Sequence, residues 1–241
     1  MSHVYRSISI IVPVFNESKF IKKTIQEIIK ADTMSLKKEI IIVDDASTDD
    51  SAKIVRQMIK RYKKELRLIE KKINEGKGAC LKKGIRECKG DIVLIQDADL
   101  EYSPDDYPSI IEPFFHYRAD VVYGSRFVST RPRRILYFWH YFANIILTLY
   151  SNMLTNLNLT DMETGYKAFR GDLIREIASR LRSKRFGFEP EITAIISKIK
   201  NLKIYEVGIT YQGRTYEEGK KITWKDGLKA FWEVTKYNLL E

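Results

Sequence analysis

Short apolar runs alternate with segments of helical spacing through the first half of the chain, and this alternation constrains the fold most strongly. The runs are too short for helices and predict strands, at 7–15, 39–44, 67–70, 91–96 and 120–123. The segments between them carry apolar residues at helical spacing and predict helices, at 17–30, 49–64, 77–88 and from about Ser103. Such an alternation favours an α/β fold with a mostly parallel central sheet and helices on both faces.

The pattern changes after Gly124, where helical segments dominate. We expect helices at 135–157, 172–182 and 190–200, then a strand at 203–210, a Gly-rich basic loop and a last helix from about Lys225. The sequence shows no internal repeat and no low-complexity linker. A single domain over 1–241 is therefore the simplest organisation.

Two aspartates, Asp97 and Asp99, follow directly after the apolar run at 92–95. Alternate residues of an extended chain point to one side, so these carboxylates and that of Glu101 are predicted to converge beyond the strand. Hard oxygen ligands suit Mg²⁺ or Mn²⁺, and such ions usually share their coordination shell with phosphates. The motif therefore favours an enzyme that uses a nucleoside diphosphate, whereas an isolated Asp-x-Asp is also compatible with a solvated loop.

Polar residues also follow the first two predicted strands. Asn16 and Glu17 come after the first strand, and Asp44 and Asp45 end the second. Ligands of parallel α/β sheets bind outside the carboxyl ends of the strands. The polar clusters therefore predict a binding site along that edge of the sheet.

The balance of charge favours anionic partners. The chain has 42 Lys and Arg against 32 Asp and Glu, a net charge of +10. Nucleotide phosphates, anionic lipid headgroups and nucleic acid are all compatible with this charge. A basic nucleic-acid-binding protein is thus an alternative from charge, but no zinc, RNP or homeodomain pattern is present, and we predict no nucleic-acid partner.

The N-terminal sequence and the cysteines indicate in which cellular compartment the protein is expected. Residues 1–6 lack the apolar core of a signal peptide, and no uninterrupted apolar stretch is long enough to span a membrane. The cysteines, Cys80 and Cys88, lie about two turns apart in one predicted helix, too far to form a disulfide. We expect reduced thiols and a cytoplasmic setting.

Several motifs occur in a fixed order and together cover nearly the whole chain. They lie at 11–17, 41–49, 74–79, 96–102, 123–126, 159–170, 188–192 and 211–221. In these motifs the chain resembles the family 2 glycosyltransferases, and within them the dolichyl- and polyprenyl-phosphate sugar synthases. The resemblance implies the GT-A fold, with nucleotide sugar and metal bound by about 1–124 and the acceptor by about 125–241.

The resemblance also implies a reaction. A sugar would pass from a nucleotide sugar, of the GDP-mannose or UDP-glucose type, to a polyprenyl or dolichyl phosphate, with inversion at the anomeric carbon. A bound Mg²⁺ or Mn²⁺ would neutralise the departing diphosphate. The attacking phosphate oxygen is mostly ionised near neutral pH, because the second phosphate pKa is about 6, so no strong general base is needed.

Site residues follow from the same resemblance, motif by motif. Asp45, rather than Asp44, is expected to accept an N–H of uracil or guanine. Arg126 is the expected acceptor-phosphate arginine, because a guanidinium fork matches phosphate oxygens. The implied sets are Pro13, Phe15, Glu17, Asp45, Lys77 and Asp97 for the nucleotide sugar, Asp97, Asp99 and Glu101 for the metal, Arg126, His140, Asn144, Arg214 and Lys221 for the acceptor phosphate, and Asp99, Arg126 and Arg214 for catalysis.

The predicted helix at 135–157 carries a broad aromatic and aliphatic surface and follows Arg131, Arg133 and Arg134. Aromatic residues beside a basic cluster suit an interfacial helix on anionic lipid, which predicts a peripheral protein on the cytoplasmic membrane face. The alternative is an internal helix of the second half, because broad apolar faces usually lie in a core.

Two other enzyme classes remain open. A family 2 transferase that acts on a glycan or glycolipid hydroxyl would need a carboxylate base, for which Glu191 or Glu189 is the candidate. A sugar-nucleotide pyrophosphorylase shares the α/β layout but would need a Gly-rich signature near residue 16, which the sequence lacks.

Overall fold

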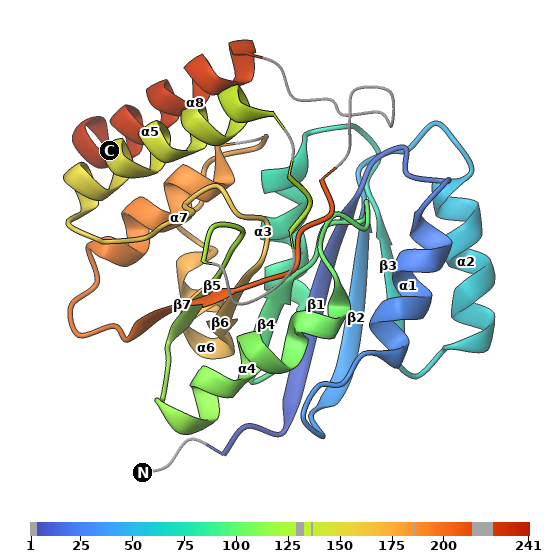
Figure 1. Cartoon of the computed structure of the whole chain (residues 1–241). Helices are drawn as coiled ribbons and strands as arrows, with labels where there is room; N and C mark the ends of the chain where they lie inside the picture. Colours follow the sequence, from blue (N-terminus) through green and yellow to red (C-terminus); the bar gives the residue numbers. More distant parts are fainter. Residues whose placement is uncertain (1–3, 129–132, 136, 186, 214–223) are drawn as a thin grey trace.

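The computed structural model describes residues 4–128, 133–135, 137–185, 187–213 and 224–241. In this part of the chain one mixed sheet has the strand order β3-β2-β1-β4-β6-β5-β7 (Figure 1). The strands are β1 (Ser7–Val14), β2 (Lys37–Asp44), β3 (Leu66–Glu70), β4 (Ile92–Ile95), β5 (Val121–Ser125), β6 (Lys167–Arg170) and β7 (Ile204–Gly208). The predicted α/β class with a mostly parallel sheet is confirmed, because β3, β2, β1 and β4 pair in parallel, as do β5 and β7.

Helices cover both faces of the sheet. They are α1 (Ile21–Lys30), α2 (Ser51–Arg61), α3 (Lys77–Glu87), α4 (Tyr107–His116), α5 (Phe138–Thr155), α6 (Gly171–Ile177), α7 (Phe188–Ser197) and α8 (Trp224–Thr235), with short turns η1 (Pro104–Asp106) and η2 (Lys236–Leu240). Alternate residues of β1 show the two layers: Ile10 packs with α1, α2 and α4, whereas Ile11 packs with α3, α6 and α7. This division follows from the period of two along a strand.

Strand β6 was missing from the sequence-based expectation, and the structure corrects it. The strand pairs antiparallel with both β4 and β5, so Ala168 lies between Leu94 and Val122. Its four residues begin with Lys167 and end with Arg170, which hides the apolar pattern of a central strand. Lys167 is nevertheless buried, because its ammonium group donates to the carbonyl of Thr164 and lies 5.1 Å from the centre of the Tyr123 ring.

The other predicted elements are present with shifted ends. Helix α6 is the largest departure, since it ends at Ile177 rather than at 182. The chain that follows is held by other partners: the backbone N–H of Gly78 donates to Arg185 O, and that of Ala79 donates to Lys184 O. Cys80 and Cys88, for which we predicted reduced thiols, are both buried, and each is a free cysteine. None of the helices within the described residues combines the length and apolar character needed to cross a membrane.

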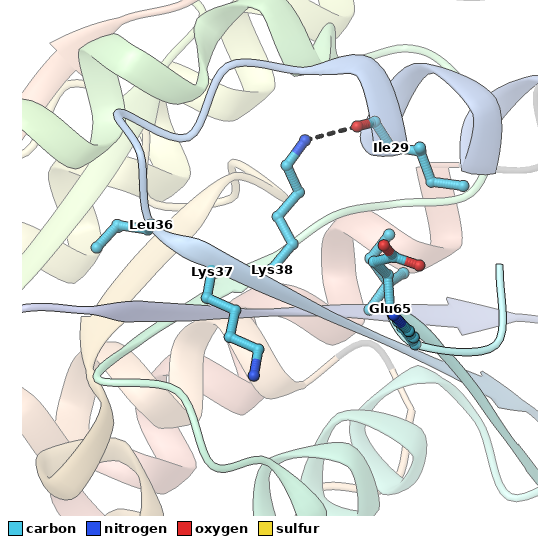
Figure 2. Close-up of a pocket in the computed structure, with 7 residues that line it drawn as sticks. Ile29, Leu36, Lys37, Lys38 and Glu65 are labelled. Atoms are coloured by element: carbon cyan, nitrogen blue, oxygen red, sulfur yellow. Dashed lines mark hydrogen bonds between the residues drawn. The ribbon is translucent and has the colours of Figure 1, made fainter.

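A cavity of about 310 Å³ lies where β2 and β3 begin, beside the carboxyl end of α1. Lys38 reaches across it, and its Nζ donates to the carbonyl oxygen of Ile29 at 2.7 Å (Figure 2). The same Nζ donates to the carbonyl oxygen of Ile28 at 3.2 Å. Burial lowers the pKa of this lysine, and the charges of Asp32 and Glu65 oppose that shift. The cavity is at the amino ends of these strands, opposite the edge where parallel sheets bind ligands. The Lys38 ammonium group in it caps the carboxyl end of α1.

We expect Lys38→Met to lower the free energy of unfolding by about 1–3 kcal/mol. The substitution removes a cation that satisfies carbonyls at the negative end of α1, and hydrogen bonds from charged groups contribute about 1.5–3 kcal/mol. Urea unfolding followed by circular dichroism measures the change. The exposed neighbour Lys37 supplies the control, and equal midpoints for Lys37→Met and Lys38→Met would contradict the capping role.

Candidate active site

The carboxyl ends of four strands gather the polar residues that the sequence singled out. β1, β2 and β4 run parallel, and β5 runs in the same direction because β6 lies antiparallel to both β4 and β5. Asn16, Asp45, Asp97 and Arg126 each follow one of these strands by one or two residues. One edge of the sheet therefore carries them all, as expected for an α/β fold.

Asp45 holds the loop that leads into α3. Its carboxylate accepts from Lys71 Nζ at 2.6 Å and from the backbone N–H groups of Glu75 and Gly76 at 3.1 and 2.6 Å. Burial opposes the charge, but these hydrogen bonds outweigh it, so the pKa of Asp45 lies below its ordinary value. Gly76 has φ of 99°, a conformation that favours glycine, and this lets the loop close around the carboxylate.

The carboxylate of Asp44, unlike that of Asp45, is only partly hydrogen-bonded. Its Oδ2 accepts from the backbone N–H of Ser47 at 3.0 Å, whereas its Oδ1 is buried and has no hydrogen-bond partner among the described residues. A buried acceptor without a donor costs free energy until a ligand or water supplies one. We predicted that Asp45 binds the base and that Asp44 has a structural role. The hydrogen bonds favour the reverse, because the carboxylate of Asp45 is held by the 71–76 loop whereas Oδ1 of Asp44 has no partner among the described residues.

The segment after β1 is tied to the start of α2. The Asn16 side-chain oxygen accepts from the backbone N–H of Thr48 at 2.8 Å, and the backbone N–H of Glu17 donates to Ser51 Oγ at 2.9 Å. Phe15 is 40% exposed beside them. Pro13 pairs with Val43 inside the sheet, so it shapes this edge from within. The arrangement leaves an exposed aromatic side chain, Phe15, at this edge of the sheet.

Lys77 joins the Asp-x-Asp loop to α7. Its Nζ lies 2.8 Å from Asp97 Oδ1 and 3.0 Å from Glu189 Oε1. Burial acts to lower the pKa of Lys77, but the charges of Asp97 and Glu189 outweigh it and hold that pKa well above the ordinary value. The lysine therefore stays charged and fixes both carboxylates.

The expected convergence of Asp97, Asp99 and Glu101 is not observed. The chain turns after β4 and Leu100 has φ of 60°, so the alternation of an extended strand does not apply there. Glu101 Oε2 instead accepts from the Tyr211 hydroxyl at 3.1 Å. Within the described residues no three His, Cys, Asp or Glu side chains are grouped to hold a metal. Asp97 and Asp99 leave a pair of hard oxygen ligands, which fits an ion that takes its other ligands from phosphates.

A tyrosine cluster beneath the acidic loop was not anticipated. Gln96 Oε1 accepts from the hydroxyl of Tyr107 at 3.0 Å and from that of Tyr166. Tyr102 stacks on Tyr166, with ring centres 5.0 Å apart, and its hydroxyl accepts from the backbone N–H of Gly165 at 3.0 Å. The cluster packs the loop against the 161–166 segment, and the repeated tyrosines were its only signal in the sequence.

Arg126 forms a buried, two-pronged ion pair with Asp161. Its Nε and Nη2 lie 2.6 Å from Asp161 Oδ2 and Oδ1, and Nη2 also approaches Asn144 Oδ1 at 3.4 Å. Asp161 is fully buried, and the backbone N–H groups at 160 and 161 donate to Glu206. Burial acts to lower the pKa of Arg126, but Asp161 outweighs it and raises that pKa well above the ordinary value. Sequence reasoning missed Asp161, although it lies in the motif at 159–170.

Other basic and polar acceptor candidates lie near Arg126 or outside the described residues. Arg133 donates to the Arg126 carbonyl at 3.3 Å and lies over the rings of Phe127 and Tyr141. The His140 carbonyl accepts from Asn144 Nδ2 at 2.7 Å, so these two predicted residues lie on one turn of α5. The calls that fall outside the described residues are Arg131, Arg214 and Lys221.

The comparisons with known proteins agree with this geometry. Residues 9–178 match the family model for glycosyl transferase family 2. The chain belongs to this family. A UDP-N-acetylglucosamine–dolichyl-phosphate N-acetylglucosaminyltransferase of Methanococcus voltae is 27% identical over 94% of each chain. A dolichyl-phosphate beta-glucosyltransferase of Dictyostelium discoideum is 30% identical, over 89% of this chain and 68% of the relative.

Solved structures support the fold. A glucosyl-3-phosphoglycerate synthase from Mycobacterium tuberculosis, in complex with Mn²⁺ and uridine-diphosphate-glucose, aligns with a TM-score of 0.73 over 98% of this chain and 78% of that chain, at 18% identity. A mannosyltransferase from Pyrobaculum calidifontis, in complex with GDP-Man and Mn²⁺, aligns with a TM-score of 0.61 over 89% of this chain and 59% of that chain, at 20% identity. The GT-A fold is confirmed, and the chain is a glycosyltransferase.

The two candidate bases of this transferase are already engaged. Glu191 accepts from the backbone N–H groups of Arg182 and Ser183, at 2.6 and 2.9 Å, and so fixes the loop between α6 and α7 to the first turn of α7. Burial raises the pKa of Glu191 despite those hydrogen bonds. Glu189 is paired with Lys77. Neither carboxylate is therefore placed as a free proton acceptor.

Helix α5 of the transferase is not internal. It packs beside α8 through its second half, where Leu147 and Ser151 are buried (Figure 1). Its first half projects aromatic side chains outward, and Trp139 is 74% exposed. Exposed apolar residues continue onto α8 and η2; together they are Phe138, Trp139, Tyr141, Phe142, Ile146, Leu149, Met153, Leu228, Trp232, Leu239 and Leu240, here called the α5–α8 apolar face.

Proposed function

We propose that this transferase moves a sugar from a nucleotide sugar to a polyprenyl or dolichyl phosphate. The observation that carries the proposal is the position of Arg126. It contacts Asn144 on the exposed helix α5, and it lies 5.3 Å from the centre of the Tyr211 ring, whose hydroxyl donates to Glu101 of the acidic loop. A lipid with a phosphate head matches both neighbours. The proposal is also supported by the relatives in Methanococcus voltae and Dictyostelium discoideum, whose names state dolichyl-phosphate acceptors.

The engagement of Glu189 and Glu191 favours a phosphate acceptor over a sugar hydroxyl. A hydroxyl must lose a proton as it attacks, and a carboxylate base has to be available for it. A phosphate monoester is already ionised near neutral pH, because its second pKa is about 6. It needs a cationic cradle instead, for which Arg126, Arg133 and Arg134 are the described candidates, with Arg214 and Lys221 as the further ones from sequence. A single in-line displacement would invert the anomeric carbon.

For the metal, we propose Asp97 and Asp99 as the protein ligands of a Mg²⁺ or Mn²⁺ ion. The ion would stabilise the negative charge of the departing diphosphate. Glu101 is directed to Tyr211, so we do not assign it as a ligand. The Mycobacterium tuberculosis and Pyrobaculum calidifontis structures, which contain Mn²⁺ with nucleotide sugars, support the use of a divalent ion.

For the nucleoside, we propose that Asp44 accepts the base N–H while Phe15 and Glu17 line the same rim. Asp44→Asn is expected to weaken binding of the cognate nucleoside diphosphate about tenfold, because the unpartnered oxygen loses its charge. Asp45→Asn is expected to lower the unfolding midpoint instead, since it loosens the 71–76 loop. Calorimetric titration and thermal unfolding of both variants separate the two roles, and a stronger affinity loss in Asp45→Asn than in Asp44→Asn would reverse the assignment.

We further propose that the α5–α8 apolar face rests on the cytoplasmic surface of an anionic membrane. Arg133 lies over the ring of Tyr141 on this face, Arg134 follows it in the chain, and the whole chain carries a net charge of +10. Apolar aromatics inserted at the headgroup level, with cations nearby, suit peripheral binding. This position would bring the acceptor's phosphate to Arg126 without removing its lipid tail from the membrane.

Replacing Trp139 and Trp232 with Ser is expected to reduce binding to phosphatidylcholine–phosphatidylglycerol vesicles at least about tenfold, because about 1.5–3 kcal/mol is lost for each large apolar side chain. Cosedimentation measures the effect. Phe115→Ser is a matched control, since Phe115 is a partly exposed aromatic on α4. Equal binding by the tryptophan variant and the control would contradict the membrane proposal.

The decisive test of function uses radiolabelled UDP-glucose, UDP-N-acetylglucosamine and GDP-mannose, each with polyprenyl phosphate, detergent and Mg²⁺ or Mn²⁺. Label that enters the organic phase identifies the donor and confirms the lipid-phosphate acceptor. Donor binding without transfer to polyprenyl phosphate would overturn the acceptor and favour a glycan hydroxyl.

A further inference from the structure

The segment 160–166 connects the two sides of the active site. At one end Asp161 holds Arg126, and at the other Gly165 lies against the Asp-x-Asp loop. A Cβ atom at position 165 would lie 2.2 Å from Asp97 Oδ2, so this close approach requires glycine. Glu163 lies midway between these two contacts. The segment belongs to the motif at 159–170, and Glu163 has no part in the nucleotide, metal or acceptor assignments.

Glu163 has an unusual environment for a carboxylate. Its Oε1 atom is buried and has no hydrogen-bond partner within the described part of the chain. The charges around it belong to Glu189, Lys167, Arg126 and Asp161. The pKa of Glu163 is raised to about 7, chiefly by burial and secondly by the negative charge of Glu189. The carboxylate is therefore desolvated and faces a second carboxylate without a hydrogen-bond donor for Oε1.

The partner that this oxygen lacks must be a neutral donor. A phosphate would be repelled by Glu163 and Glu189, and the described residues offer no third ligand that would complete a metal site here. Lys167 is already turned to the Thr164 carbonyl, and Lys77 to Asp97 and Glu189. Hydroxyl groups donate to carboxylates without bringing charge, and a sugar presents several of them.

We propose that the Glu163 carboxylate accepts hydrogen bonds from hydroxyl groups of the donor's sugar and thereby selects which sugar is transferred. The inference rests on the proposed use of a nucleotide sugar, but not on the identity of the acceptor. The sugar would lie between the diphosphate at Asp97 and Asp99 and the acceptor phosphate at Arg126. Glu163 lies in a segment that contacts both of those sides, through Asp161 at Arg126 and through Gly165 at Asp97.

The test compares binding of each nucleotide sugar with binding of its nucleoside diphosphate, by calorimetry with Mn²⁺ and without acceptor. In Glu163→Gln, measured at a pH above 7 where the wild-type carboxylate is mostly ionised, we expect the affinity for the cognate nucleotide sugar to fall about tenfold, since the sugar hydroxyls lose a charged acceptor. The affinity for the nucleoside diphosphate is expected to stay unchanged. Glu176→Gln, a substitution on the exposed side of α6, is the matched control.

Deoxy analogues of the cognate donor sharpen the test. Loss of one sugar hydroxyl should weaken binding to the wild type, and the same loss should have little further effect in Glu163→Gln. Glu163→Asp, which keeps the charge but shortens the side chain, is the second variant should Glu163→Gln fold poorly, and it should show the same selective loss. Equal weakening of nucleotide sugar and diphosphate, or unchanged affinity for both, would overturn the proposal.

Failure of this inference differs from failure of the proposed function. Donor binding that depends on Glu163, without transfer to polyprenyl phosphate, would retain the sugar contact and reject the acceptor. A wild-type protein that binds no nucleotide sugar more tightly than its nucleoside diphosphate would overturn the sugar contact.

Discussion

Asp99→Asn is expected to reduce sugar transfer by about 10²–10³-fold while the protein stays folded. The substitution keeps the size of the side chain but removes the charge that we assign to a divalent ion, and loss of one electrostatic contact to a developing charge has effects of this order. Asp99 lies in the turn after β4 rather than in the core, so the sheet does not depend on it. Initial rates at several Mn²⁺ concentrations measure the effect.

The control for this variant is Asp105→Asn, because Asp105 is an exposed acid in η1 close to the same loop. Chelation of the metal should abolish wild-type transfer, and added Mn²⁺ or Mg²⁺ should restore it. Full activity of Asp99→Asn, or activity of the wild type that survives chelation, would remove the metal assignment.

Arg126→Met is expected to lower the free energy of unfolding by about 3–5 kcal/mol. The change leaves Asp161 fully buried without its cation, and an uncompensated buried charge is costly. The double variant Arg126→Met with Asp161→Leu should recover much of this loss, because two apolar side chains need no counter-charge. Urea unfolding of the two single variants and the double variant gives the coupling between the residues.

Arg126 also allows a kinetic comparison. Arg126→Lys keeps a charge but loses the planar fork, so we expect KM for polyprenyl phosphate to rise more than KM for the nucleotide sugar. An equal rise in both would assign Arg126 to holding the site together rather than to the acceptor. A single Arg126→Met variant as stable as the wild type would contradict the buried ion pair.

Residues that follow the ends of strands were the most predictable part of the site. Asp97 comes after an apolar run, and its place at the carboxyl edge of the sheet follows from the direction of parallel strands. Glu101 was less predictable, because the chain turns at Leu100 and the alternation of a strand ends there. A period of two applies only while the backbone stays extended.

The partners of charged residues could not be predicted. Asp44 and Asp45 are adjacent and chemically identical, and only the approach of Lys71 and Gly76 distinguishes them. Likewise, Asp161 is 35 residues from Arg126 in sequence, and the two meet in a sheet in which β6, which follows Asp161, lies between β4 and β5.

Local periodicity, strand direction and the polar residues at strand ends are properties of short segments, and they sufficed for the α/β class and for the edge that carries the site. The choice of which carboxylate is satisfied and which is left for a ligand arose from contacts between distant segments. Glu163 is the clearest case, because its Oε1 atom is buried without a hydrogen-bond partner in the described part of the chain, and the charges around it include Glu189 and Arg126, which are distant in sequence. Burial and hydrogen-bond pairing are set by such long-range contacts, and no pattern within a single segment encodes them.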